Sequence, residues 1–178
     1  MFSSTLCLLM MTLVGCSMGC TPGATGPAGP PGRDGRDGGA NRSAFTAVKN
    51  STQTGILGDA VTFEESPTNI NNHFDLATGK FTCVFPGIYV FTCNIGLFFL
   101  NDGENENNDV HISIVKNGDV IATAHARVGG FEQDFDTAST SAVLELGAGD
   151  QVWLQFATGD KVYSNDLKLT SFTGYLIN

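Results

Sequence analysis

The feature that most constrains this chain is a two-residue alternation between residues 81 and 95. Mainly aromatic and cysteine side chains fall on one face, and mainly β-branched side chains fall on the other. A strand points successive side chains to opposite faces, whereas a helix would distribute these positions around its circumference. A Pro-Gly pair at 86–87 interrupts the alternation. The stretch therefore predicts two strands joined by a turn, each with one face in a hydrophobic core. The core-directed positions are Phe81, Cys83 and Phe85 before the turn and Tyr89, Phe91, Cys93 and Ile95 after it.

The chain keeps this β character from residue 41 to its end. Short runs of β-branched and aromatic residues are separated by turn sequences such as Asn117-Gly118-Asp119 and Gly147-Ala148-Gly149. No helical periodicity of useful length occurs. Many short strands with regular turns predict an all-β, antiparallel sandwich. The predicted strands are 45–49, 61–63, 81–85, 88–100, 110–116, 120–126, 139–146, 151–156 and 172–177.

Glycine recurs at every third position from Gly23 to Gly38. This is the requirement of a collagen triple helix, in which only glycine fits at the axis where three polyproline-II chains meet. A flexible glycine-rich linker is the alternative, but the unbroken period and the internal Gly-Pro-Pro triplet favour a collagen-like stalk within residues 20–40. So short a triple helix needs a globular part that trimerises beside it.

Residues 1–19 have the pattern of a secretory signal peptide. The apolar run Leu6–Val14 is too short to span a bilayer and is followed by small residues. Leu13-Val14-Gly15-Cys16 also resembles a bacterial lipoprotein box, which is the alternative. We therefore expect a secreted, extracellular protein with a signal peptide at 1–19, an N-terminal cysteine and collagen-like repeats at 20–40, and a globular domain at 41–178.

The charge balance is acidic, with 18 Asp and Glu against 9 Lys and Arg, a net charge of −9. Charges within the glycine repeat cancel, so the excess lies in the globular part. An acidic surface repels phosphate groups, which argues against nucleic acid and against an anionic membrane as partners. It suits cationic partners or calcium, or is simply a solvated surface.

Seven residues at fixed distances resemble the C1q globular domain. That family has Phe, Asn or Asp, an aromatic, Phe and then Gly-x-Tyr-x-Phe-x-aromatic at set intervals. The final aromatic is replaced here by Cys93, which is the one departure. The resemblance continues through 149–154 and 172–176. The residues in register are Phe63, Asn69, Phe74, Phe81, Gly87, Tyr89 and Phe91.

The resemblance implies a jelly-roll sandwich of the C1q and tumour-necrosis-factor type, with 41–178 as a C1q head that assembles as a homotrimer or higher oligomer. It also implies a binding protein, in which several identical weak sites gain avidity on repetitive surfaces. A multivalent, lectin-like pattern-recognition molecule of innate immunity, binding carbohydrate or microbial surfaces, is the leading hypothesis. The alternative is a secreted signalling or synapse-organising ligand for a cell-surface receptor.

The sequence contains no catalytic or metal-ligand motif. His73, His111 and His125 are far apart in the chain and lack the spacings of zinc sites. No nucleophile elbow or phosphate-binding glycine loop is present. We therefore interpret the histidines as surface or strand residues and predict that the protein is not an enzyme.

The cysteines allow several roles. Cys20 precedes the glycine repeat and would link chains in an oxidising compartment, or stay a free thiol. Cys83 and Cys93 both fall on core-directed positions. They form either one intrachain disulfide or two buried free thiols, which pack as small hydrophobic groups. The sequence leaves both alternatives open, because pairing depends on geometry.

Carboxylates alternate at Glu132, Asp134 and Asp136, so a strand would place all three on one face. Converging carboxylates suit a hard cation with oxygen ligands. Some C1q-like heads bind calcium near the trimer axis, and Asp136 matches an acidic position that they use. Calcium is therefore a candidate cofactor. The acidic stretch 101–109 is either a solvated connection or a ligand-binding loop.

Two sequons for N-glycosylation begin at Asn41 and Asn50, close to the end of the glycine repeat. Both are expected at the surface. The run Leu97–Leu100 is apolar at every position, so it predicts a strand that contacts the core on one side and a trimer interface on the other.

Overall fold

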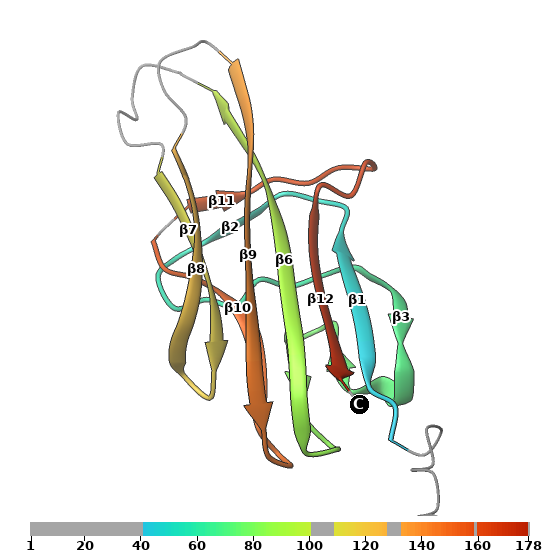
Figure 1. Cartoon of the computed structure of the whole chain (residues 1–178). Helices are drawn as coiled ribbons and strands as arrows, with labels where there is room; N and C mark the ends of the chain where they lie inside the picture. The colour runs from blue at the N-terminus through green and yellow to red at the C-terminus, as the bar shows by residue number, and fades with distance from the viewer. Residues whose placement is uncertain (1–40, 101–108, 128–132, 159, 178) are drawn as a thin grey trace, which may run out of the picture. The chain divides into compact units, whose positions relative to one another are not determined.

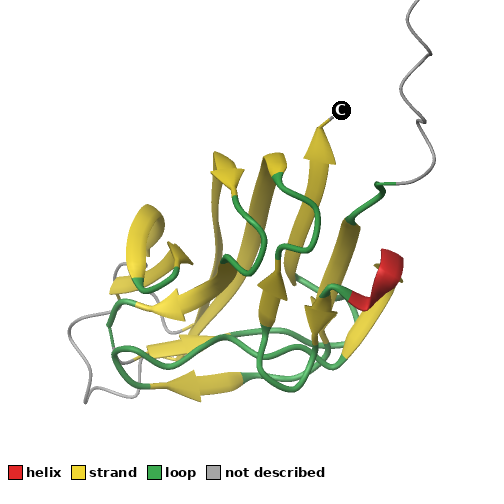
Figure 2. Cartoon of the chain, turned by 90° about the horizontal axis from the view of Figure 1, so that it is seen from below, coloured by secondary structure: helices red, strands yellow, loops and turns green. Residues whose placement is uncertain are grey.

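The computed structural model describes residues 41–100, 109–127, 133–158 and 160–177. The predicted signal peptide, Cys20 and the collagen-like repeats lie outside these residues, as do most of the acidic stretch 101–109 and Glu132. Nearly all of the described chain is strand or loop, and the only helix among the described residues is one short turn, seen in Figure 2.

The described residues form twelve strands and the helical turn η1. The first half of the chain contributes β1 (Ala44–Lys49), β2 (Gln53–Gly55), β3 (Glu65–Asn69), η1 (Ile70–Asn72), β4 (Phe74–Asp75), β5 (Lys80–Thr82) and β6 (Gly87–Leu100). The second half contributes β7 (Asp109–Lys116), β8 (Asp119–Arg127), β9 (Gln133–Leu146), β10 (Gln151–Phe156), β11 (Asp160–Val162) and β12 (Thr170–Ile177).

Two five-stranded sheets pack against each other. The first has the order β3-β1-β12-β6-β9 and the second β4-β5-β10-β7-β8, while β2 and β11 form a small third sheet. Figure 1 shows the strands of the first sheet side by side. Every strand pair is antiparallel, and sequence neighbours often lie in different sheets, which is the crossing pattern of a jelly roll. The predicted all-β, antiparallel fold is confirmed.

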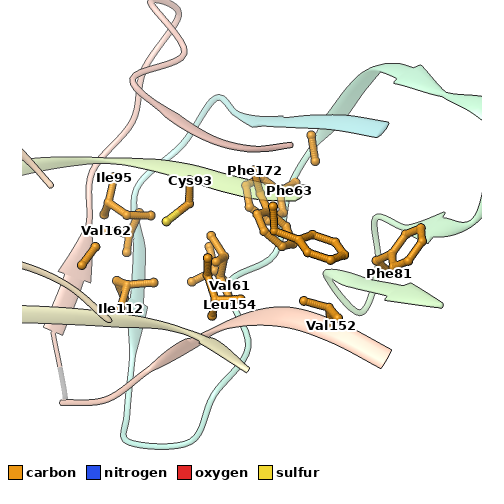
Figure 3. Packing of buried hydrophobic residues seen from close by; sticks show 14 of the residues in the cluster. Val61, Phe63, Phe81, Cys93, Ile95, Ile112, Val152, Leu154, Val162 and Phe172 are labelled. Carbon is orange, nitrogen blue, oxygen red and sulfur yellow. The ribbon is translucent and has the colours of Figure 1, made fainter. Parts of the chain in front are cut away.

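The core lies between the two sheets and is rich in phenylalanine (Figure 3). Phe45 of β1 is central: its ring centroid lies 4.4 Å from that of Phe74 and 5.4 Å from that of Phe81. The positions of β6 that the alternation assigns to the core are indeed buried. Tyr89, Phe91 and Ile95 each have no exposed surface. The first sheet supplies one layer of these side chains and the second sheet the other.

The strand prediction is wrong at two places. The predicted strand 81–85 ends at Thr82 in β5, so Cys83 and Phe85 lie beyond it, and Phe85 is only half-buried. Residues 61–63 are not a strand, although Val61 and Phe63 are buried in the core. Their segment is held instead by single contacts: the Val61 amide donates to the carbonyl of Leu154 at 2.9 Å, and the buried Lys49 donates to the carbonyl of Thr62. The neighbouring edge strand β3 was not predicted, because its sequence, Glu-Ser-Pro-Thr-Asn, is polar and contains a proline.

Candidate functional site

The outward face of the first sheet carries exposed apolar side chains at one end. Ile88 of β6 pairs directly with Ile177 of β12, and the half-buried Val90 lies between Tyr175 and Val143 in the next row. Val143 is 66% exposed and the other three outer members are close to half exposed. A solvated sheet face would normally be polar at these positions. We call Ile88, Val90, Val143, Tyr175 and Ile177 the apolar patch.

Small hydroxyl side chains cross the middle of this face. The register aligns Thr46, Thr173, Thr92 and Ser141 in one row across β1, β12, β6 and β9. The hydroxyl groups of Thr173 and Thr46 are hydrogen-bonded at 3.2 Å. These side chains are short, so the middle of the face carries no bulky group in this row.

Aromatic side chains lie at the other end of the face. Phe98 of β6 is directly opposite Phe135 of β9, and their ring centroids are 4.5 Å apart. The ring of Tyr163 lies 5.2 Å from that of Phe98. Phe135 is 61% exposed. Leu97 is buried in the core, whereas Phe98 packs on the outer face of the sheet. The apolar run that begins at Leu97 therefore contributes to both faces of β6.

A shallow hollow of about 240 Å³ lies beside this aromatic cluster, lined by Leu97, Phe135, Asp136, Thr137 and Leu169. Gly96 of β6 pairs with Thr137 and forms an isolated bridge with Tyr163. A Cβ atom at Gly96 would come within 2.7 Å of both Leu169 and the carbonyl oxygen of Tyr163. The absence of a side chain at Gly96 therefore lets the segment before β12 pack close against β6.

Asp136, the proposed calcium ligand, lies at this hollow and is exposed. One of its carboxylate oxygens accepts a hydrogen bond from the amide of Thr137 at 2.7 Å. Asp134 occupies β9 and pairs with Phe99, so the strand expected at these two positions is present, and Glu132 lies outside the described residues. Among the described residues, no three or more His, Cys, Asp or Glu side chains are grouped to hold a metal ion. The calcium site stays a prediction.

Cys83 and Cys93 are two separate buried thiols. Of the two alternatives, the structure has the free thiols and not the intrachain disulfide. The sulfur of Cys83 lies 3.8 Å from the hydroxyl of Tyr89, at the start of β6. Cys93 lies four residues further along β6, roughly 13 Å at the usual strand rise. That separation along one strand keeps the thiols apart, and burial raises the pKa of Cys93 to about 11, which keeps this thiol protonated and unreactive.

The two predicted glycosylation sites differ in their surroundings. Asn41 is exposed. Asn50 is half-buried: its side-chain nitrogen, the atom that would carry a glycan, donates to Glu65 at 2.6 Å, and its side-chain oxygen is buried without a partner. In the folded head, Asn41 is therefore the better placed acceptor.

His111 and His125 are strand residues, as predicted, whereas His73 is a half-buried loop residue, and the first two lie close together in space. His111 of β7 faces His125 of β8 across the ladder, and their ring centroids are 4.3 Å apart. Sequence analysis missed this pair because the two residues have no motif spacing. His73 is separate: its Nδ1 is hydrogen-bonded to the hydroxyl of Ser43 at 2.8 Å, and burial lowers the pKa of its imidazole.

The family model of the C1q domain matches residues 44–177. The chain belongs to the C1q domain family. All seven residues that carried the resemblance fall within the matched region. Five of them are buried aromatic residues of the core, and Asn69 closes a loop by accepting from the amide of Phe74 and donating to its carbonyl.

Curated relatives agree with this assignment to the C1q family. The chain is 34% identical to Caprin-2 of Danio rerio, over 76% of this chain and 14% of Caprin-2. It is 37% identical to Complement C1q and tumor necrosis factor-related protein 9B of Homo sapiens, over 66% of this chain and 33% of that protein. The chain therefore spans a third or less of the length of these relatives.

Solved structures share the fold of this C1q head. The globular domain of zebrafish complement 1qA superposes with a TM-score of 0.58 at 22% identity, covering 76% of this chain and 98% of that domain. Eiger TNF from S. frugiperda superposes with a TM-score of 0.62 at 12% identity, covering 77% and 93%. At these identities the comparison establishes the jelly-roll fold alone. Within the described part of the chain, no helix has the length and apolar character needed to cross a bilayer.

Proposed function

We propose that this chain is a secreted, homotrimeric C1q-like binding protein that recognises repetitive ligands on carbohydrate or microbial surfaces, as a pattern-recognition molecule of innate immunity. The observation that carries the trimer is the apolar patch of Ile88, Val90, Val143, Tyr175 and Ile177. On a head with excess negative charge, contiguous exposed apolar side chains favour contact with another protein surface over contact with water.

The occupant of this face is a second copy of the chain. The small hydroxyl row across the middle of the sheet allows close approach, and the aromatic cluster of Phe98, Phe135 and Tyr163 extends the apolar surface at the other end. Three identical heads held together would present three copies of each ligand-binding loop. Simultaneous contacts of individually weak sites then increase the apparent affinity for a repetitive surface.

Calcium at Asp136 belongs to the same proposal. Asp136 is the one described carboxylate at the hollow, and calcium takes six to eight oxygen ligands. A single described carboxylate with one oxygen already bonded to the Thr137 amide does not complete such a site within one chain. Several copies of the chain brought together would supply several such carboxylates. Calcium binding is therefore expected to depend on assembly of the trimer.

The assembly is tested by measuring the mass of the secreted protein in solution with multi-angle light scattering. Val143→Asp places a charge within the apolar patch and should convert trimer to monomer. Val120→Asp is the matched control, because Val120 is 62% exposed on β8 of the other sheet and should leave the trimer intact. A monomeric wild-type protein, or a trimeric Val143→Asp variant, would contradict the proposed face. Loss of the trimer in EDTA would implicate calcium.

Ligand class is tested separately on the trimer. Binding to several microbial glycans, lost when the protein is monomeric, supports pattern recognition. Binding to one cell-surface receptor with high affinity, and to no glycan or microbe, would overturn that role in favour of the secreted signalling or synapse-organising alternative.

A further inference from the structure

The stacked imidazoles of His111 and His125 form a cluster that the proposed assembly does not use. The two residues occupy directly opposed positions of the antiparallel pair β7 and β8. Their rings lie 4.3 Å apart between centroids and only 15° from parallel. Opposed residues of an antiparallel ladder have Cβ atoms about 4.5–5.5 Å apart, so the backbone register itself holds the two side chains together.

Both imidazoles are on the outward face of the second sheet. The neighbours of His111 along β7, Val110 and Ile112, are buried in the core, and so are Ala124 and Ala126 on either side of His125. Alternation along each strand therefore directs both histidines away from the core. This face belongs to the sheet that the proposed trimer leaves free, so a ligand here does not depend on the proposed function.

His111 has an unsatisfied nitrogen. Its Nδ1 atom is buried and has no hydrogen-bond partner, whereas the Nδ1 of His73 is bonded to Ser43. Buried polar side-chain atoms are normally paired, and each exception calls for an explanation such as an absent ion. Transition-metal ions bind imidazole nitrogens, and two neighbouring histidines supply two such ligands.

We propose that His111 and His125 form a two-histidine binding site for a divalent transition-metal ion of the Zn²⁺, Cu²⁺ or Ni²⁺ class. Two nitrogens bound to a tetrahedral ion at about 2.0–2.1 Å lie roughly 3.3 Å apart. The lone pair of an imidazole nitrogen lies in the ring plane, and the two planes are only 15° from parallel, so one ring must turn out of the stack before both nitrogens face one ion. His125 is the more exposed of the two, so the turn is expected on its side in exchange for its present contacts, and coordination would give the buried nitrogen of His111 a partner.

The chemistry of this site differs from that of the proposed calcium site. Imidazole nitrogen suits borderline metals such as zinc, copper and nickel, whereas calcium prefers oxygen ligands. Among the described residues no third His, Cys, Asp or Glu side chain completes a group with the pair. The bound ion therefore keeps open positions for water or for a donor from an outside ligand, as catalytic and ligand-bridging metal sites do.

Isothermal titration of the untagged full chain with CuCl₂ and, separately, ZnCl₂ tests the site. We expect one ion bound per chain near neutral pH, and weaker binding as the solution is acidified, because a protonated imidazole is not a ligand. His125→Ala should weaken binding at least tenfold, and His111→Gln should do the same. His73→Gln is the matched control and should bind as the wild type does.

His125→Ala changes an exposed side chain and is expected to fold normally, which thermal unfolding checks. Added Zn²⁺ should raise the Tm of the wild type but not that of His125→Ala. Paramagnetic broadening by Cu²⁺ should be strongest at the NMR signals of His111 and His125. Unchanged affinity in His125→Ala, equal loss in His73→Gln, or no binding of Cu²⁺ or Zn²⁺ by the wild type would overturn the proposal.

Discussion

The outward faces of the two sheets cover the same core but are built differently. On the second sheet the outward side chains largely satisfy one another across the strands. Lys80 lies over the ring of Trp153, Gln151 donates to Thr82, Ser113 and Thr123 share a hydrogen bond, and His111 stacks on His125. On the first sheet, Ile88, Val143, Tyr175 and Ile177 are exposed with apolar surface that no described part of the chain covers.

This difference is the basis of the proposed assembly. Cross-strand pairs of polar, aromatic and charged groups stabilise a sheet without a further partner. Exposed aliphatic groups contribute favourable free energy only when another surface covers them and removes them from water. Val120 and Ile121 at the start of β8 are exposed apolar residues of the second sheet, but they lie next to a turn at one edge and do not continue across the strands.

The largest effects should come from the core, which both faces share. Phe91 beneath the first face and Leu154 beneath the second are fully buried. Phe91→Ala should lower the free energy of unfolding by about 3–5 kcal/mol and Leu154→Ala by about 2–5 kcal/mol, because each leaves a cavity. Urea unfolding at fixed protein concentration measures both. Thr92→Ala, at the outward position next to Phe91, should change stability by about 0.5 kcal/mol or less.

A change at Gly96 tests the packing at the aromatic end of the first face. Gly96→Ala adds a Cβ atom within 2.7 Å of Leu169 and of the carbonyl oxygen of Tyr163, so the segment must move. We expect a loss of about 1–3 kcal/mol in the free energy of unfolding. Gly147→Ala is the control, because its nearest neighbour would lie 3.9 Å away. Equal stability of the two variants would contradict this account of the hollow.

Acid sensitivity should trace to Asp150, which joins the β9–β10 turn to the β7–β8 hairpin. Its carboxylate accepts from the side-chain nitrogen of Asn117, the amide of Gly147 and the ammonium of Lys116, and these bonds lower its pKa to about 2. Because the pKa of this carboxyl is lower in the folded state, its ionised form stabilises the fold at pH values above its unfolded pKa near 3.8. This contribution is lost as the pH falls towards 2. Asp150→Asn should flatten stability against pH in this range.

Thermal unfolding between pH 2 and pH 5 measures this dependence. Asp119→Asn is the control, because Asp119 lies on the β7–β8 hairpin but accepts none of these three bonds. A wild-type profile that Asp150→Asn leaves unchanged would contradict the assignment.

The smallest effect is expected at the pair of Lys80 and Trp153. The Lys80 nitrogen lies 4.4 Å from the ring centroid, and such contacts at partly exposed sites contribute about 0.5–1 kcal/mol. Lys80→Ala should lower the free energy of unfolding by that amount, whereas Lys80→Arg should retain most of it. Urea unfolding compares the variants. A larger loss in the arginine variant would indicate that packing of the lysine stem, and not its charge, stabilises this pair.

The amino-acid sequence by itself determined which side of β6 faces the core. The predicted core positions of this strand are buried: Tyr89, Phe91, Cys93 and Ile95. Alternation along a strand is a local property, so the spacing of apolar residues in the sequence predicts it directly. The turn residues and the spaced aromatic anchors similarly determined the antiparallel fold and its family. Strand limits failed where a buried residue lies outside any strand, as at Val61, Phe63 and Cys83.

The tertiary structure alone decided which residues meet. His111 lies beside His125, Cys83 lies apart from Cys93, and Gly96 lies under Leu169, and none of these relations has a signal in sequence spacing. They depend on strand register and on which strands become neighbours. Those choices are made by long-range pairing across the whole head, whereas the alternation of a strand reports only on the strand itself.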